Sequence, residues 1–282
     1  MIIRATREDF SRHHFNRDLA RKIAQVKCTF DLAGAILLTD IARNVVGISK
    51  YRNKLQEWYY TTLDDLCKRH PYLSRSTINR TLKKLREDRV LLTTDEHNRR
   101  RYDRTLWYSI PDPETLRLAS GDEGNISFIV NDAVKYGLEP AILLSNVKYW
   151  TIYNMADDPM YLYEYQPLSP SELSDHSLVN LPMNAWTIRR ALNVLVDEGA
   201  LERKRNNQKS NACFLYRVVE DGRPLVPPPD ADYPTECTPH QEWIVSRLSW
   251  VSIMPNINVR NVFGCNQSVV NANVQNNAFK KL

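Results

Sequence analysis

Glycine is scarce in this chain, with 8 residues in 282, and the sequence contains no Gly-x-x-x-x-Gly-Lys segment or other glycine-rich loop. Such loops present backbone N–H groups to nucleotide phosphates, so their absence argues against ATP-driven chemistry. The sequence also lacks a Gly-x-Ser-x-Gly elbow and a His-Glu-x-x-His helix, which mark common hydrolases and metalloproteases. We therefore expect neither enzymatic activity nor a cofactor.

Paired cysteines and long apolar runs are missing as well. The five cysteines form no Cys-x-x-Cys pair, so neither a disulfide framework nor a zinc site is expected. No run of about 18 apolar residues occurs, and the charged N-terminal stretch lacks the apolar core of a signal peptide. These absences predict a soluble, cytoplasmic protein with no membrane contact and no metal.

Carboxylate pairs and tyrosines leave two enzymatic alternatives to weigh. Asp64-Asp65 and Asp157-Asp158 suggest the metal site of a nuclease. We interpret the first pair as charges in the first turn of a helix and the second, which precedes Pro159, as a turn. Strand transfer by one of the 14 tyrosines is another alternative, but the His-hydrophobic-His motif that usually accompanies a nicking tyrosine is missing.

Positive charge is concentrated in the first part of the chain. Residues 1–110 carry 23 Lys and Arg against 13 Asp and Glu, whereas residues 111–282 carry 15 against 20. The net charge of +5 therefore combines +10 in the first part with −5 in the second. This asymmetry makes the first part the stronger candidate for contact with nucleic-acid phosphates, although a basic surface can also serve solubility alone.

The most informative feature that is present is an internal repeat. A Thr-Ile-x-Arg-x-Leu-x-x-Leu pattern begins the matching segments 77–91 and 187–201, which are 110 positions apart, and Ala-Ile-Leu-Leu occurs at both 35–38 and 141–144. In each copy we expect an apolar helix (31–45 and 139–153), a loop with aromatic residues, and a second helix (62–69 and 170–177). A third helix should follow, capped by Ser74 or Asn184, and then a two-stranded hairpin.

The remaining segments complete the predicted organisation of the chain. Residues 1–30 should form a basic N-terminal arm, with a helix over 5–26 that either lies along a DNA backbone or packs on the first domain. Two domains follow at 31–112 and 128–220, joined by a linker at 113–127. Residues 221–282 should form a proline-rich spacer and an asparagine-rich, flexible tail, with one short helix over 241–254.

The third helix of the first copy carries the side chains best suited to contact DNA. Ile78, Leu82 and Leu85 should face the core, which leaves a polar outer face. Asn and Arg side chains form bidentate hydrogen bonds with adenine and guanine edges, and hydroxyl groups at a helix start suit phosphate oxygens. The candidate DNA-binding residues of this helix are Arg75, Ser76, Thr77, Asn79, Arg80 and Lys83.

The hairpin loop of the first copy adds further arginines, which would lie over the sugar-phosphate backbone or enter a minor groove unless the loop is an ordinary solvated turn. These candidates are Arg99, Arg100, Arg101 and Arg104. The second copy follows the same plan with less charge, and its candidates are Asn184, Arg189, Arg190, Asn193, Arg203, Lys204, Arg205 and Lys209. Between a packed anchor and a base contact, we favour the anchor for Trp186.

Several segments resemble one family of DNA-binding domains. They are Trp58-Tyr59-Tyr60-Thr61-Thr62, Leu73-Ser74-Arg75-Ser76-Thr77-Ile78 and Arg104-Thr105-Leu106-Trp107-Tyr108-Ser109-Ile110. They resemble the winged-helix domains of phage and mobile-element replication proteins. The tandem layout over about 31–219 is similar to plasmid replication initiators that bind repeated origin sites through two winged helices. The resemblance implies a mainly α fold with small β-hairpins, and two tandem winged-helix domains. Winged helices also host many transcription regulators.

The sequence therefore predicts a non-enzymatic protein that binds double-stranded DNA in a sequence-specific manner. The role implied by the resemblance is initiation of replication for a phage, plasmid or satellite element, with a helicase or other host factor recruited through 241–282 and with homodimerisation as an option. One alternative is a winged-helix transcriptional regulator. A second alternative is a protein-interaction adaptor whose second winged helix binds a protein instead of DNA.

Overall fold

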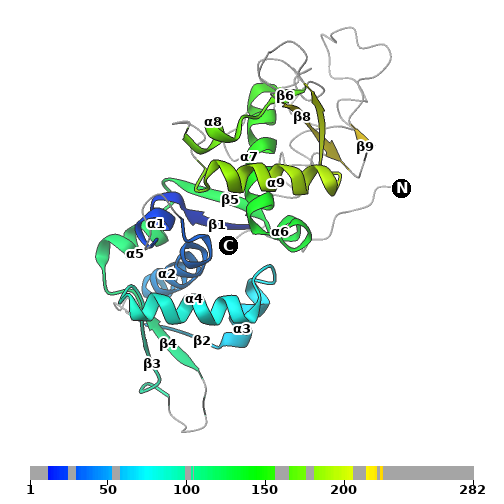
Figure 1. Ribbon diagram of the computed structural model, residues 1–282. Helices are drawn as coiled ribbons and strands as arrows, with labels where there is room; N and C mark the ends of the chain where they lie inside the picture. The colour runs from blue at the N-terminus through cyan, green and yellow to red at the C-terminus, as the bar shows by residue number, and fades with distance from the viewer. Residues whose placement is uncertain are drawn as a thin grey trace, which may run out of the picture. The chain divides into compact units, whose positions relative to one another are not determined.

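The chain is a mixed α+β protein with small antiparallel sheets (Figure 1). The computed structural model describes residues 12–24, 30–52, 58–98, 103, 105–155, 165–175, 181–205, 214–220 and 223–224. No helix in these segments combines the length and apolar character needed to span a membrane. The spacer, short helix and tail were expected over 221–282, and of this segment all but residues 223–224 lie outside the described residues.

One order of elements occurs twice: strand, helix, helix, strand, helix, helix, strand, strand. The first copy consists of β1 (Arg12–Asn16), α1 (Arg17–Lys22), α2 (Leu32–Arg52), β2 (Tyr59–Thr61), α3 (Leu63–Arg69), α4 (Arg75–Glu87), β3 (Leu92–Thr94) and β4 (Leu106–Ser109). The second consists of β5 (Asn125–Ile129), α6 (Val130–Tyr136), α7 (Leu138–Met155), β6 (Gln166–Pro167), α8 (Pro170–Asp175), α9 (Ala185–Asp197), β7 (Leu201–Arg205) and β8 (Phe214–Glu220). Helix α5 (Pro113–Ser120) lies between the copies along the chain, and β9 (Arg223–Pro224) pairs with β8.

Sheet topology repeats as well. The first copy contains an antiparallel sheet in the order β2-β4-β3, and the second contains one in the order β6-β8-β7. Both predicted hairpins are therefore confirmed, and each gains a third strand from the aromatic segment that precedes its second helix. The structural repeat begins at Arg12, whereas the likeness between the two copies in sequence is visible only from Ala35 onward.

By its contacts the chain divides into two compact units. The first comprises residues 1–145 and 170–194, and the second comprises residues 146–169 and 195–282. Helices α7 and α9 continue across the divisions between these units. The predicted domain boundaries at 112 and 128 remain predictions.

Helix α2 is the centre of the first unit's core in the first copy. Four consecutive residues, Ala35, Ile36, Leu37 and Leu38, are all buried. Other elements must therefore pack around most of the helix surface and not only along one face. Helices α1, α4 and α5 and strands β1, β2 and β4 supply those neighbours. Because α2 contacts both the first strand and the third helix of the copy, it fixes the position of α4 within this unit.

The predicted helix over 5–26 is wrong for residues 12–16, which form strand β1. This strand pairs antiparallel with β5, whose sequence lies more than a hundred residues away, so local periodicity could not reveal it. Residues 17–22 do form a helix, α1, and Asn16 caps it by accepting a hydrogen bond from the Leu19 backbone N–H at 2.9 Å. This part of the arm packs into the core, with Phe15 and Leu19 fully buried.

The segment predicted as a linker at 113–127 has regular structure over much of its length. Asp112 caps helix α5 by accepting hydrogen bonds from Thr115, and Pro113 occupies the first helical position, where a missing N–H costs nothing. Lys22 of α1 pairs with Asp112 at 2.8 Å and with Glu114. The segment therefore packs against the first copy and then leads into β5.

The second unit contains the sheet β6-β8-β7. Strand β7 pairs with β8 from Leu201 opposite Val218 to Arg205 opposite Phe214. Leu201, Tyr216 and Val218 are buried, whereas Arg203, Lys204 and Arg205 are exposed. On β8 the buried residues Tyr216 and Val218 alternate with half-buried ones, whereas the last three residues of β7 are all exposed.

Candidate nucleic-acid interface

Helix α4 begins where the sequence predicts, at the residue after Ser74. The Ser74 hydroxyl accepts a hydrogen bond from the Thr77 backbone N–H at 3.1 Å, which satisfies one of the free donors at the helix start. Ser76 and Thr77 also turn their hydroxyl groups toward Ser74, at 2.9 Å and 2.8 Å. These two hydroxyl groups are therefore engaged within the cap.

The inner face of α4 is apolar and packed. Ile78, Leu82 and Leu85 are buried, as their spacing predicts, and α4 contacts both α2 and α3. Burying side chains of this size contributes about 1.5–3 kcal/mol each, so the helix is held firmly by one side. The opposite side of the helix therefore faces solvent.

The outer face of α4 presents the predicted candidates together. Arg75, Ser76, Asn79, Arg80 and Lys83 are exposed, whereas Thr77 is half-buried. Two of the cations have partners: Arg75 pairs with Asp64 of α3, and Lys83 pairs with Glu87 one turn away at 3.7 Å. Within the described parts of the chain, neither a side-chain hydrogen bond nor an ion pair joins Asn79 or Arg80 to another residue, and both side chains are exposed to water.

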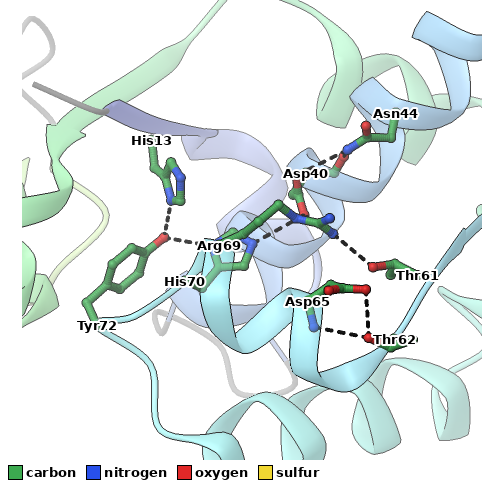
Figure 2. Close-up of polar contacts among 9 residues, drawn as sticks. All are labelled: His13, Asp40, Asn44, Thr61, Thr62, Asp65, Arg69, His70 and Tyr72. Carbon is green, nitrogen blue, oxygen red and sulfur yellow. Dashed lines mark hydrogen bonds and ion pairs between the residues drawn. The ribbon is translucent and has the colours of Figure 1, made fainter. Parts of the chain in front are cut away.

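The turn between α3 and α4 is anchored by a partly buried polar network (Figure 2). Tyr72 in this turn places its hydroxyl 2.6 Å from His13 Nδ1 of β1 and 3.0 Å from His70 Nδ1. His70 Nε2 lies 3.3 Å from Asp40 Oδ2 of α2, and Arg69 Nε donates to the same oxygen at 3.0 Å. The network joins β1, α2 and the turn before α4, so it fixes where α4 begins.

Donor and acceptor roles in the network follow from its chemistry. An ionised carboxylate only accepts, so His70 Nε2–H must donate to Asp40, which leaves His70 Nδ1 to accept from the Tyr72 hydroxyl. The Tyr72 oxygen then accepts from His13 Nδ1–H. In this assignment each contact of the network has one donor and one acceptor.

The electrostatics agree with that assignment. Burial, and then the neighbouring His70, lowers the pKa of His13 to about 4, which keeps this imidazole neutral near pH 7. Burial alone would raise the pKa of Asp40, but the hydrogen bond from His70 and the charge of Arg69 outweigh it and hold that pKa below its usual value. Burial, followed by the charge of Asp40, raises the pKa of Tyr72.

Asn98 organises the base of the first copy's hairpin loop. Its amide nitrogen donates to the backbone oxygens of Thr105 at 2.7 Å and Asp103 at 3.1 Å, and its amide oxygen accepts from the Trp107 indole N–H at 2.8 Å. One side chain thus bridges the two sides of the loop. The loop candidates Arg99, Arg100, Arg101 and Arg104 lie outside the described residues.

The second copy's third helix, α9, also begins as predicted. Asn184 caps it by accepting a hydrogen bond from the Thr187 backbone N–H at 2.8 Å, the equivalent of the Ser74 contact 110 positions earlier. Its amide oxygen therefore has a structural role, although the side chain is exposed. Arg189, Arg190 and Asn193 are exposed on the same helix.

Trp186 is not the packed anchor that the sequence favoured. Its side chain is 67% exposed, and the Arg190 guanidinium lies over its ring at 5.1 Å from the centroid. The equivalent position in the first copy is Ser76, so the two helices present different chemistry near their starts. An exposed indole is costly for solubility and adds a large flat surface suited to contact with another molecule.

The second copy's hairpin candidates lie against aromatic rings. Arg203 lies over Phe214 at 4.7 Å, and Lys204 lies over Tyr165 at 4.2 Å. Arg205 is exposed at the end of β7, and Lys209 lies outside the described residues. These cation–π contacts orient the positive groups without neutralising them.

Sequence reasoning missed the residues that position this interface. The network of His13, Asp40, His70 and Tyr72 was missed because its members come from separate parts of the sequence. The only available signal was that the sequence suggests no other role for His13. The bridging role of Asn98 was missed too, because it depends on the facing Trp107. Among the described residues, no group of three or more His, Cys, Asp or Glu side chains is arranged to hold a metal.

Comparison with known proteins adds no family to these observations, because neither a protein-family model nor a curated protein matches the chain. Any function must therefore be argued from the geometry of the interface and from the resemblance noted above.

Proposed function

We propose that this chain is a sequence-specific double-stranded DNA-binding protein in which each copy is a winged helix. The order of helix, strand, helix, helix and two strands supports this proposal in both copies. In such a domain the third helix enters the major groove and the hairpin contacts the flanking backbone. Helices α4 and α9 would be the reading helices, with the first copy as the primary reader because it has more positive charge.

One observation carries the proposal: the outer face of α4. The helix is capped by Ser74 and buried on one side, and the turn before it is held by the polar network. Its exposed side chains therefore project from a rigid support. Asn79 and Arg80 have hydrogen-bonding groups that face solvent, and these are the side chains that match adenine and guanine edges. A docking surface for a protein would favour aromatic and apolar side chains at its centre, and α4 exposes none.

Duplex binding is tested by mixing the purified chain with labelled fragments that tile the DNA around its own gene, in the presence of excess unrelated duplex. We expect one or a few fragments to be retained with affinity at least about 10³ times that of the others, and binding to weaken steeply with salt. Equal binding to all fragments would reject sequence specificity, and no binding at low salt would reject the DNA-binding function itself.

The proposed biological role is initiation of replication for a phage, plasmid or satellite element. It rests on the resemblance to tandem winged-helix initiators, and recruitment of a helicase or another host factor is assigned to residues 241–282. Deleting 241–282 should leave DNA affinity intact and stop maintenance of a plasmid that carries the bound region as its origin. Loss of repression of a reporter gene, with plasmid maintenance unchanged, would instead favour a transcriptional regulator.

A further inference from the structure

Trp186 and Arg190 form an exposed pair of side chains on α9. They are one turn of the helix apart, so both lie on the same side of it. Trp186 is 67% exposed, the Arg190 side chain is exposed as well, and the guanidinium carbon lies over the indole ring at 5.1 Å from its centroid. Among the described residues, no ion pair joins Arg190 to a carboxylate. The pair therefore presents a positive charge beside an apolar ring.

The first copy has only half of this pair. A shift of 110 positions places Arg80 of α4 on Arg190 and Ser76 on Trp186. Both arginines are exposed, and arginine is the side chain that forms two hydrogen bonds with O6 and N7 of guanine in the major groove. The indole is what the second copy adds, and it lies beside the shared guanidinium. Trp186 therefore changes the surroundings of a base contact that both copies can make.

The residues around Trp186 on α9 suit nucleic acid better than a protein partner. The centre of a protein interface usually gathers several aromatic and apolar side chains. The other exposed residues of α9 before Asp197 are all polar, namely Arg189, Arg190 and Asn193. Residues 184–196 contain two arginines and no carboxylate. One apolar ring next to positive charge matches a major groove, in which phosphates flank the methyl groups of thymines.

The thymine methyl group is the apolar feature of the major groove. Apolar side chains contact it, whereas a guanidinium group binds guanine. Guanine pairs with cytosine, so a thymine contacted at the same time belongs to a neighbouring base pair. Neighbouring pairs are about 3.4 Å apart along the duplex. The 5.1 Å between the Arg190 guanidinium carbon and the Trp186 ring centroid is short enough for the two groups to contact adjacent pairs.

We propose that Trp186 is a specificity-determining residue that contacts the C5-methyl group of a thymine, in the base pair next to a guanine bound by Arg190. This inference rests on the proposed function and adds to it the chemical group that the second copy recognises. The indole also orients the guanidinium, because the ring face attracts the cation. The first copy, with Ser76 at the equivalent position, binds DNA without this dependence on a methyl group.

Deoxyuridine supplies the test, because it pairs as thymine does and lacks only the methyl group. The full-length chain first selects its site from a random duplex library. Fluorescence anisotropy then gives the affinity for duplexes in which each thymine is replaced singly. We expect one replacement, next to a guanine, to weaken binding by wild type about fourfold, the effect of losing one buried methyl group. Trp186→Ser, which introduces the residue of the first copy, should bind the two duplexes equally.

Two further variants separate the indole from its neighbours. Trp186→Phe keeps an apolar ring and should retain the dependence on the methyl group. Arg189→Ser removes an exposed side chain next to Arg190 and is the matched control. It should also retain the methyl dependence, even where its overall affinity for DNA is lower.

A selected site in which every thymine can be replaced without loss of affinity would overturn the inference and leave the proposed function standing. Equal losses in wild type and Trp186→Ser would overturn it too, because another residue would then contact the methyl group. If wild type selects no duplex, the proposed function itself is wrong and the inference fails with it.

Discussion

The ion pair between Arg75 and Asp64 holds one guanidinium group of the candidate interface against α3. Asp64 also places a negative charge beside the start of α4, where DNA phosphates would lie. We predict that Asp64→Asn raises affinity for duplex DNA several-fold and steepens the slope of log affinity against log salt by about 0.9, because one more cation can contact phosphate. Fluorescence anisotropy with a labelled duplex over a salt series measures both.

Asp122 provides a matched control for that substitution. It is also an exposed aspartate paired with an arginine, Arg43, at 3.2 Å, but it lies away from α4 in the chain. Asp122→Asn should leave the slope unchanged. Equal effects of the two substitutions would mean that only net charge matters and that the face of α4 has no special part in binding.

Tyr72 makes the central contacts of the network under α4. We predict that Tyr72→Phe lowers the free energy of unfolding by about 1–3 kcal/mol, because His13 and His70 would each lose a buried hydrogen-bond partner. Urea denaturation followed by circular dichroism measures this change. Tyr60→Phe is the control, since its ring is 52% exposed, and it should change stability by less than about 0.5 kcal/mol.

At the scale of elements, the ends of α4 and α9 make the same turn with different residues. Arg89 has φ of 56° and Gly199, 110 positions later, has φ of 71°, so both adopt the left-handed conformation that follows many helices. Only glycine adopts it without a Cβ penalty. Among the described residues, apart from its chain neighbours, no atom would lie within 4 Å of a Cβ at Gly199, so conformation alone should set the cost of a side chain there.

We therefore predict that Gly199→Ala lowers the unfolding free energy by about 1 kcal/mol and that Arg89→Gly raises it slightly, since relief of strain exceeds the added freedom of the unfolded chain. Thermal or urea denaturation of the two single variants gives the comparison. Stabilisation by Gly199→Ala would show that the strain argument fails at this turn.

Strand β1 carries two histidines that should make stability depend on pH. Burial lowers the pKa of His13 to about 4, with a contribution from His70, and burial with the charge of Arg43 lowers that of His14 to about 4. The unfolded chain binds these protons near pH 6.5, whereas the folded chain binds them only near pH 4. The contribution of these groups to the free energy of unfolding is therefore fully present above pH 6.5 and is lost as the pH falls toward 4.

The melting temperature should accordingly fall between pH 6.5 and pH 4. Removing one of the two groups in His14→Gln should reduce that pH-dependent loss by roughly half. Differential scanning calorimetry at several pH values gives the profile. A variant whose profile matches that of wild type would show that His14 is not buried as a neutral group.

Local signals predicted the three main helices of each copy, α2 to α4 and α7 to α9, but they missed α5, α6 and the distant strand pairings. Ser74 and Asn184 cap helices through hydrogen bonds to residues three positions ahead, so short sequence patterns sufficed. Strand β1 exists because β5 pairs with it, and no periodicity within 5–26 records that partner. The expected outward face of α4 was confirmed, because the spacing of Ile78, Leu82 and Leu85 determines which side is buried.

The candidate site was predicted less completely than the helices that carry it. Arg75, Asn79, Arg80 and Lys83 could be named from helical spacing, but the pairing of Arg75 with Asp64 depends on how α3 packs. Trp186 was misjudged because a large aromatic residue usually packs, whereas here its helix leaves it in solvent. Contact of any of these residues with DNA remains a prediction.

For the whole molecule, the repeat and the charge distribution together suggest two readers of unequal strength. The element order is the same in both copies, yet residues 1–110 have a net charge of +10 and residues 111–282 one of −5. Phosphate contacts supply most of the non-specific affinity for DNA, so the first copy should contribute more of it. The second copy, with its exposed Trp186, would add selectivity at an adjacent site.

The outer face of α4 should read base pairs, and one measurement tests this most directly. Once a bound fragment is known, affinities of wild type, Asn79→Ala and Arg80→Ala are measured for a series in which each base pair of the site is changed singly. We expect each variant to lose about 1–3 kcal/mol of discrimination at one or two adjacent positions and to keep it elsewhere. If both variants rank the whole series as wild type does, α4 does not read the DNA and the account is wrong.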